Sequence, residues 1–182
     1  MTIRVVAVDD HALVRQGIVG LLASQPDIEV VGQAGNARDG IDVIASVSPD
    51  VVLMDIAMPG QSGLDATREI RDRFPAVHVV VVTIHDREDY LFQALRAGAA
   101  GYVLKGAEVQ DLLEAVRTAQ RGEVYLLPSI TKKLVADYLR RSQAGEDRTT
   151  YDGLTDRERE ILGLIAQGLT TNAIAEIGRA HV

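Results

Sequence analysis

Short apolar segments alternate with longer amphipathic segments over the first 120 residues, and this alternation limits the possible folds more than any other feature of the chain. Several of the short segments are apolar throughout, which is typical of strands covered on both faces. We predict five strands, at Ile3–Val8, Ile28–Gly32, Val51–Met54, Val77–Val82 and Gly101–Leu104.

The segments between these strands have a helical period. In the first helix the apolar stripe consists of Leu13, Val14, Gly17, Ile18, Leu21 and Leu22, and in the last it consists of Val109, Leu112, Leu113 and Val116. Weaker stripes lie within 41–47, 64–70 and 90–95. Parallel strands need crossovers of this length, and right-handed crossovers place helices on both faces of a sheet. The sequence therefore predicts an α/β fold with a five-stranded, doubly wound parallel sheet.

The composition restricts the chemistry and suggests a boundary. The chain has no cysteine, which excludes disulfides, thiolate metal sites and cysteine nucleophiles. The apolar run at the N-terminus is too short for a signal peptide and no other run approaches a membrane span, so we expect a cytoplasmic protein without membrane contact. Residues 1–120 carry the whole formal charge of −7 and residues 121–182 are neutral, so we place a domain boundary near residue 120.

Four of the five predicted strands run into a charged or hydroxyl-bearing side chain. The first strand is followed by Asp9 and Asp10, the third by Asp55, the fourth by Thr83 and the fifth by Lys105. The carboxyl ends of parallel strands form one edge of a sheet, where functional groups collect. We therefore expect these side chains to converge.

Three crowded carboxylates repel one another unless a cation offsets their charge. Oxygen ligands favour a hard ion that keeps several waters, Mg²⁺ first and Mn²⁺ second. Lys105 would add a positive charge opposite this ion and Thr83 a hydroxyl donor, which together suit a phosphoryl group. Because Asp55 would stand closest to that group, we expect its carboxylate to be the nucleophile and to become an aspartyl phosphate.

Each of these residues alone has an ordinary structural explanation. An aspartate after a strand usually forms a turn or caps the next helix, and a lone lysine is usually a solvated surface charge. Thr83 alone would be an ordinary strand residue. The combination at successive strand ends favours a functional site.

Residues 3–120 resemble the receiver domain of two-component response regulators, which has a flavodoxin-like fold. The motifs that carry the resemblance are Val8-Asp9-Asp10-His11, Met54–Gly60, Val82-Thr83 and Gly101–Lys105. The resemblance implies that a histidine kinase phosphorylates Asp55 in a Mg²⁺-dependent reaction. Gly106 stands where many receivers have proline, so the peptide geometry after Lys105 is left open.

The resemblance also implies individual roles. Asp10 and Asp55 would contact the metal directly, Asp9 would act mainly through water, and the Ala57 carbonyl would be a backbone ligand. Thr83 and Tyr102 match the family's switch pair, in which the hydroxyl moves toward the phosphoryl group and the ring turns inward behind it. An interface or partly buried aromatic remains an alternative for Tyr102.

Two histidines flank the expected site, His11 and His85. Either is a candidate metal ligand, but two histidines without a third or a helical pair are a weak metal signature. We interpret both as loop residues that tune hydrolysis of the phosphate.

The last third of the chain contains a linker over residues 121–149, with a helical stripe in Ile130–Arg141, followed by residues 150–182. Leu154–Glu176 resembles the start of the LuxR-type helix-turn-helix DNA-binding domain, and the combination is similar to the NarL/FixJ group. A recognition helix and a fourth helix would follow, but few residues remain. Residues 176–182 can be back-translated to a sequencing-adapter stretch, so we expect an incomplete all-α domain in a truncated gene fragment.

The function expected from these features is a response regulator whose phosphorylation promotes homodimerisation and binding of promoter DNA. A receiver-only signalling fragment without DNA binding is one alternative. The other is a haloacid dehalogenase-like aspartyl phosphohydrolase, but that group resembles Asp-x-Asp after the first strand, whereas here Asp9 and Asp10 are adjacent. We expect no enzymatic activity beyond self-phosphorylation from small phosphodonors and slow autodephosphorylation.

Overall fold

The structure is a computed structural model that describes residues 2–127, 131 and 136. Strands and helices alternate through this part of the chain. The strands are β1 (Ile3–Val8), β2 (Ile28–Ala34), β3 (Val51–Met54), β4 (His78–Thr83), β5 (Gly101–Leu104) and β6 (Tyr125–Leu126). The helices are α1 (Ala12–Ala23), α2 (Ala37–Val47), α3 (Gly63–Arg73), α4 (Glu88–Ala97) and α5 (Val109–Gln120).

The described strands form one parallel sheet in the order β2-β1-β3-β4-β5-β6. The five predicted strands and the doubly wound topology are confirmed. The structure adds β6, which the sequence analysis had assigned to the linker. This strand has only two residues, and it is defined by its pairing with β5, in which Gly101 lies opposite Tyr125. A segment this short has no periodicity of its own.

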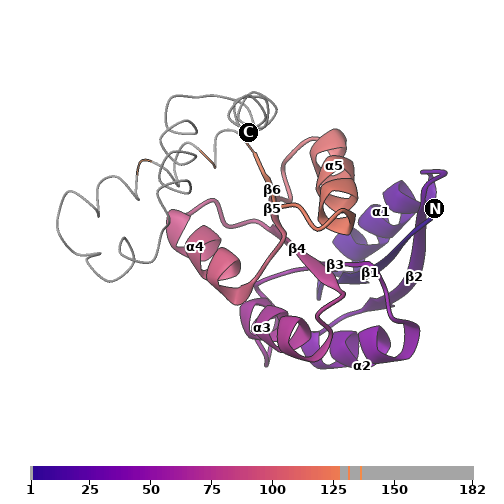
Figure 1. Cartoon of the computed structure of the whole chain (residues 1–182), viewed down its shortest axis with the longest axis horizontal. Helices are drawn as coiled ribbons and strands as arrows, with labels where there is room; N and C mark the ends of the chain where they lie inside the picture. The colour runs from indigo at the N-terminus through magenta and orange to yellow at the C-terminus, as the bar shows by residue number, and fades with distance from the viewer. Residues whose placement is uncertain (1, 128–130, 132–135, 137–182) are drawn as a thin grey trace, which may run out of the picture. The chain divides into compact units, whose positions relative to one another are not determined.

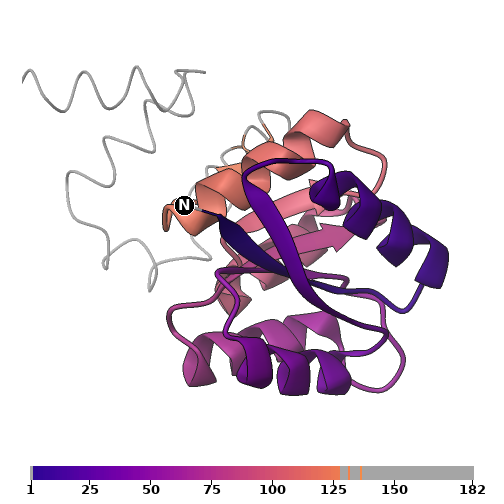
Figure 2. The same ribbon diagram turned by 90° about the vertical axis from the view of Figure 1, so that its right-hand side faces the viewer.

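Helices cover both faces of the sheet. In Figures 1 and 2, α1 and α5 lie on one face, and α2 and α3 lie on the other with α4 beside α3. Side chains that alternate along the strands fill the two interfaces. In β1, Val5 packs in the cluster that includes Leu113 of α5, whereas Val6 packs in the cluster that includes Ile44 of α2.

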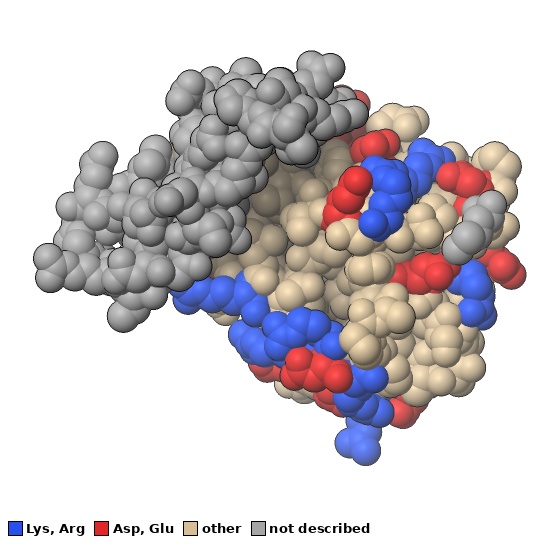
Figure 3. All heavy atoms as spheres, viewed as in Figure 1, with Lys and Arg blue, Asp and Glu red and all other residues tan. Residues whose placement is uncertain are grey.

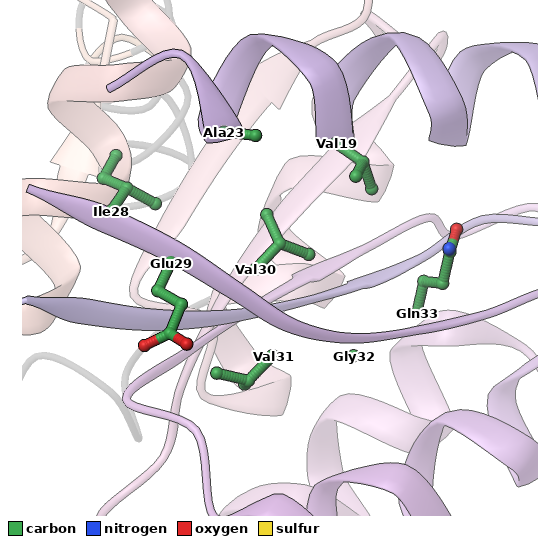
Figure 4. A pocket seen from close by; sticks show the side chains of 8 residues that line it. All are labelled: Val19, Ala23, Ile28, Glu29, Val30, Val31, Gly32 and Gln33. Carbon is green, nitrogen blue, oxygen red and sulfur yellow. The ribbon is translucent and has the colours of Figure 1, made fainter. Parts of the chain in front are cut away.

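Helix α1 packs loosely against the sheet. Leu22 is its one buried residue, and Leu13 is 84% exposed. The predicted apolar stripe is therefore only partly covered, because Leu13 lies in the first turn of α1 and faces solvent. A hollow of about 480 Å³ separates α1 from the edge strand β2, where Val19 and Ala23 face Val30 (Figure 4).

The chain divides into two compact units, Met1–Leu126 and Leu127–Val182. In the second unit only residues 127, 131 and 136 are described, so the predicted linker helix, the tether and the helix-turn-helix lie outside the described residues, apart from Thr131 and Ala136, which are helical. Among the described helices, none has the length and apolar character needed to cross a membrane.

Candidate functional site

The carboxyl ends of the central strands bring the expected residues to one edge of the sheet. Hydrogen bonds just beyond the strand ends continue the strand register: the Asp55 amide donates to the Val8 carbonyl at 2.9 Å and the Lys105 amide to the Thr83 carbonyl at 2.8 Å. The Asp9 amide donates in the same way to the Ala34 carbonyl. These backbone hydrogen bonds thus fix the Cα positions of the three residues at the edge of the sheet.

A largely buried lysine side chain, 11% exposed, joins two of the carboxylates. Lys105 Nζ lies 2.7 Å from Asp55 Oδ2 and 2.8 Å from Asp9 Oδ2. Asp55 is 2% exposed and Asp9 is 3% exposed. Burial alone would lower the pKa of Lys105, but its hydrogen bonds and ion pairs with Asp55 and Asp9 outweigh burial and raise that pKa. The ammonium is therefore a fixed positive charge beside the candidate nucleophile.

The remaining acid, Asp10, lies on the other side of Asp9 together with His11. His11 Nδ1 is 2.8 Å from Asp10 Oδ1 and 3.6 Å from Asp9 Oδ1. Asp10 Oδ1 is buried without a hydrogen-bond partner among the described residues. One donor atom from each of Asp9, Asp10, His11 and Asp55 lies within 4.8 Å of the others. This set can hold a metal ion, and it includes a histidine.

Two residues that the sequence analysis did not single out shape this site. An ideal Cβ on Gly63 would lie 1.8 Å from the Asp55 carbonyl oxygen, so only glycine permits this approach of α3. The Arg15 guanidinium donates to the Asp9 carbonyl. The position of Gly63 directly after Ser62, the N-cap of α3, is a signal that could have identified it; Arg15 has no comparable sequence signal.

The loop after β3 places Ala57 next to Asp55. The Ala57 amide makes a long contact of 3.4 Å with Asp55 Oδ1, and Ala57 itself is exposed. Gly60 has a φ of +85°, a left-handed conformation that glycine adopts without strain.

Thr83 and Tyr102 both bind the backbone of His85 in the loop after β4. The His85 amide donates to Thr83 Oγ1 at 3.2 Å, and the Tyr102 hydroxyl donates to the His85 carbonyl at 2.7 Å. Tyr102 is 2% exposed, and burial, with smaller contributions from Asp86 and Tyr90, raises the pKa of its phenol. The ring therefore lies inside the protein in this structure.

His85 is not part of the metal-ligand group. Its ring stacks on Tyr90 with centroids 4.2 Å apart and an interplanar angle of 13°. Of the two flanking histidines, only His11 approaches the carboxylates.

The surface shown in Figure 3 carries both signs of charge, with basic and acidic side chains next to each other. Helix α3 illustrates this, because Arg68 pairs with Asp65 and Arg73 with Glu69. This arrangement does not form the one-sided basic surface that binds the nucleic-acid backbone.

Two family models match the chain. The response regulator receiver domain matches residues 5–117, and the LuxR family of bacterial regulatory proteins matches residues 152–177. The chain therefore belongs to the response regulators of two-component systems and combines a receiver domain with a LuxR-type region. Members of this class receive phosphoryl groups from histidine kinases and act on DNA.

Known proteins align with most of this chain. The oxygen regulatory protein NreC of Staphylococcus aureus is 43% identical over 95% of this chain and 81% of its own length, and the transcriptional regulatory protein DegU of Brevibacillus brevis is 36% identical over 96% and 79%. A LuxR-family response regulator from Aurantimonas superposes with a TM-score of 0.73 at 32% identity, covering 76% of this chain and 99% of that one. Each of these relatives is named as a regulatory protein or response regulator, which argues against the phosphohydrolase alternative.

Proposed function

We propose that Asp55 is the phosphoacceptor of this response regulator and that a divalent cation is required for its phosphorylation. The observation that carries the proposal is the convergence of Asp9, Asp10 and Asp55 within 4.8 Å, with Lys105 on two of them. Asp55 is the only one of the three acids at the centre of the sheet, after β3.

Mg²⁺ or Mn²⁺ fits this set of oxygen donors. Asp10 and Asp55 would bind the ion directly, Asp9 through water, and the Ala57 carbonyl as a backbone ligand. The buried Asp10 Oδ1 supports this assignment, since it makes no hydrogen bond among the described residues and a buried oxygen loses its solvation unless a cation or donor replaces water. When bound, the ion supplies positive charge that stabilises the transferring phosphoryl group.

Asp55 and Lys105 have different roles in the phosphoryl transfer. A carboxylate oxygen of Asp55 attacks the phosphorus of a phosphohistidine, so that a P–O bond forms as the P–N bond breaks and the electron pair leaves with the imidazole. Lys105 Nζ donates a hydrogen bond to Asp55, so its ammonium can pair with the negative charge of the phosphoryl group on this residue. Small phosphodonors would react in the same way, and slow autodephosphorylation would follow by attack of water.

Thr83 and Tyr102 are the proposed switch pair. Both bind the backbone of His85, so a movement of the Thr83 hydroxyl toward a phosphoryl group would release the His85 amide and change the loop before α4. The altered face would promote homodimerisation and DNA binding through the LuxR-type region. We propose that the receiver domain spans residues 3–120, the linker residues 121–149 and the helix-turn-helix DNA-binding region residues 150–182.

Intact-mass measurement tests the phosphoacceptor directly. The protein is incubated with acetyl phosphate and Mg²⁺, and the wild type should gain one acid-labile phosphoryl group. Asp55→Asn should gain none because the amide is a poor nucleophile. The matched control is Asp65→Asn on α3, an exposed acid paired with Arg68, which should label like the wild type. Equal labelling of Asp55→Asn would reject the role of Asp55.

A further inference from the structure

We propose that His11 is an additional side-chain ligand of the cation bound in the pocket of Asp9, Asp10 and Asp55, and that its imidazole shifts the preference of the pocket from Mg²⁺ toward transition-metal ions such as Co²⁺. This inference rests on the proposed metal site. It adds a nitrogen donor to a set that otherwise contains only oxygen.

The distances suit two ligands of one ion. Octahedral complexes with bonds of about 2.1 Å place neighbouring donor atoms about 3 Å apart and opposite ones about 4 Å apart. His11 Nδ1 lies 2.8 Å from Asp10 Oδ1 and 3.6 Å from Asp9 Oδ1. The complete group of four donors lies within 4.8 Å, slightly wider than opposite ligands of one ion, so the donors must move together a little when an ion binds.

His11 and Asp10 already lie together in the absence of an ion. His11 Nδ1 is 2.8 Å from Asp10 Oδ1, a distance at which both atoms can also bind one cation. His11 is the N-cap residue of α1, yet its side chain makes no capping hydrogen bond. The imidazole thus faces the carboxylates of Asp9 and Asp10 rather than the helix N-terminus, and its side chain is 63% exposed, so solvent ions can reach it.

The lysine and the imidazole use different oxygens. Lys105 approaches Oδ2 of both Asp9 and Asp55, whereas His11 approaches Oδ1 of Asp9 and of Asp10. The Asp9 carboxylate thus stands between an ammonium on one side and an imidazole on the other. A cation bound on the His11 side does not require Lys105 to leave.

The types of ligand atom, oxygen or imidazole nitrogen, determine which metal ion the pocket prefers. Mg²⁺ prefers oxygen, whereas imidazole suits later divalent metals, whose affinity rises from Mn²⁺ to Co²⁺ to Ni²⁺. A nitrogen ligand should therefore strengthen binding of Co²⁺ more than of Mg²⁺.

Calorimetric titration of the full chain with Mg²⁺, Mn²⁺ and Co²⁺, combined with pulsed EPR of bound Mn²⁺, tests the proposal. His11→Ala should lower the ratio of Co²⁺ to Mg²⁺ affinity by about 10-fold, the scale on which ligand-shell changes act, and should remove the ¹⁴N coupling of Mn²⁺. His78→Gln is the control, since His78 begins β4 at the opposite edge of the sheet, and it should keep both properties.

The outcomes separate the two proposals. If Asp10→Asn weakens binding of all three ions while His11→Ala leaves the affinity ratio and the ¹⁴N coupling unchanged, the metal site stands and the role of His11 is rejected. If Asp10→Asn leaves Mn²⁺ binding unchanged, the metal site itself is rejected, and the role of His11 with it.

Discussion

At the scale of single residues, Lys105 connects two acidic side chains at the edge of the sheet. Its ammonium offsets two carboxylates that are each almost fully buried. Removing one partner of a buried ion pair costs more than the pair contributes, because the remaining charge is left without solvent or counterion. Here two such charges would remain.

Lys105→Met should therefore lower the free energy of unfolding by about 3 kcal/mol in the absence of divalent ions. Added Mg²⁺ should stabilise this variant more than the wild type, since the ion takes over part of the charge compensation. Urea unfolding with and without Mg²⁺ measures both effects. Arg68→Met, which removes an exposed pair on α3, serves as the control, and an equal Mg²⁺ response in all three proteins would contradict the account.

At the scale of elements, the contact between α3 and the end of β3 positions the candidate nucleophile. Gly63 at the start of α3 lies against the Asp55 carbonyl, and its amide donates to the Ile56 carbonyl at 3.1 Å. Any side chain at position 63 must push the helix and the Asp55 backbone apart. The geometry of the nucleophile thus depends on a residue that carries no functional group.

Gly63→Ala should lower the free energy of unfolding by about 1–3 kcal/mol through overpacking and should slow phosphorylation by acetyl phosphate. Gly17→Ala is the matched control, because Gly17 lies within α1 with open space at its Cβ position. That change should stabilise the protein by about 0.5–1 kcal/mol and leave the rate unchanged. Chemical unfolding and intact-mass time courses measure these quantities, and equal rates in both variants would oppose a positioning role for Gly63.

The contact of β6 with α5 makes the free energy of unfolding depend on pH in the alkaline range. Burial, together with the hydrogen bond from its hydroxyl to Asp111 Oδ1, raises the pKa of Tyr125 from 10.0 to about 12. Between these values the unfolded chain releases the phenol proton while the folded chain keeps it, so the free energy of unfolding falls as pH rises. Tyr125→Phe should show a smaller loss from pH 10 to pH 12 in urea titrations. A loss as steep as that of the wild type would exclude this contribution.

At the scale of the whole molecule, most of the receiver could be predicted because its signals are local. The apolar runs gave the central strands, and parallel connectivity brought Asp9, Asp55 and Lys105 to one edge. Contacts between distant segments were not predictable: the strand β6 exists only through its pairing with β5, and the approach of Gly63 to Asp55 depends on how α3 is seated. The sequence likewise did not distinguish His11 from His85 as a metal ligand, because only the fold determines which imidazole lies beside the carboxylates.

The central claim is that the edge of the sheet assembles a cation-dependent pocket in which Asp55 takes up the phosphoryl group. Borohydride reduces an acyl phosphate on aspartate to homoserine, so peptide mass spectrometry after treatment with acetyl phosphate locates the modified residue. We predict homoserine at position 55 in the presence of Mg²⁺ and its loss when EDTA replaces the ion. Homoserine at Asp9 or Asp10 instead, or equal conversion of Asp55 in EDTA, would contradict the account.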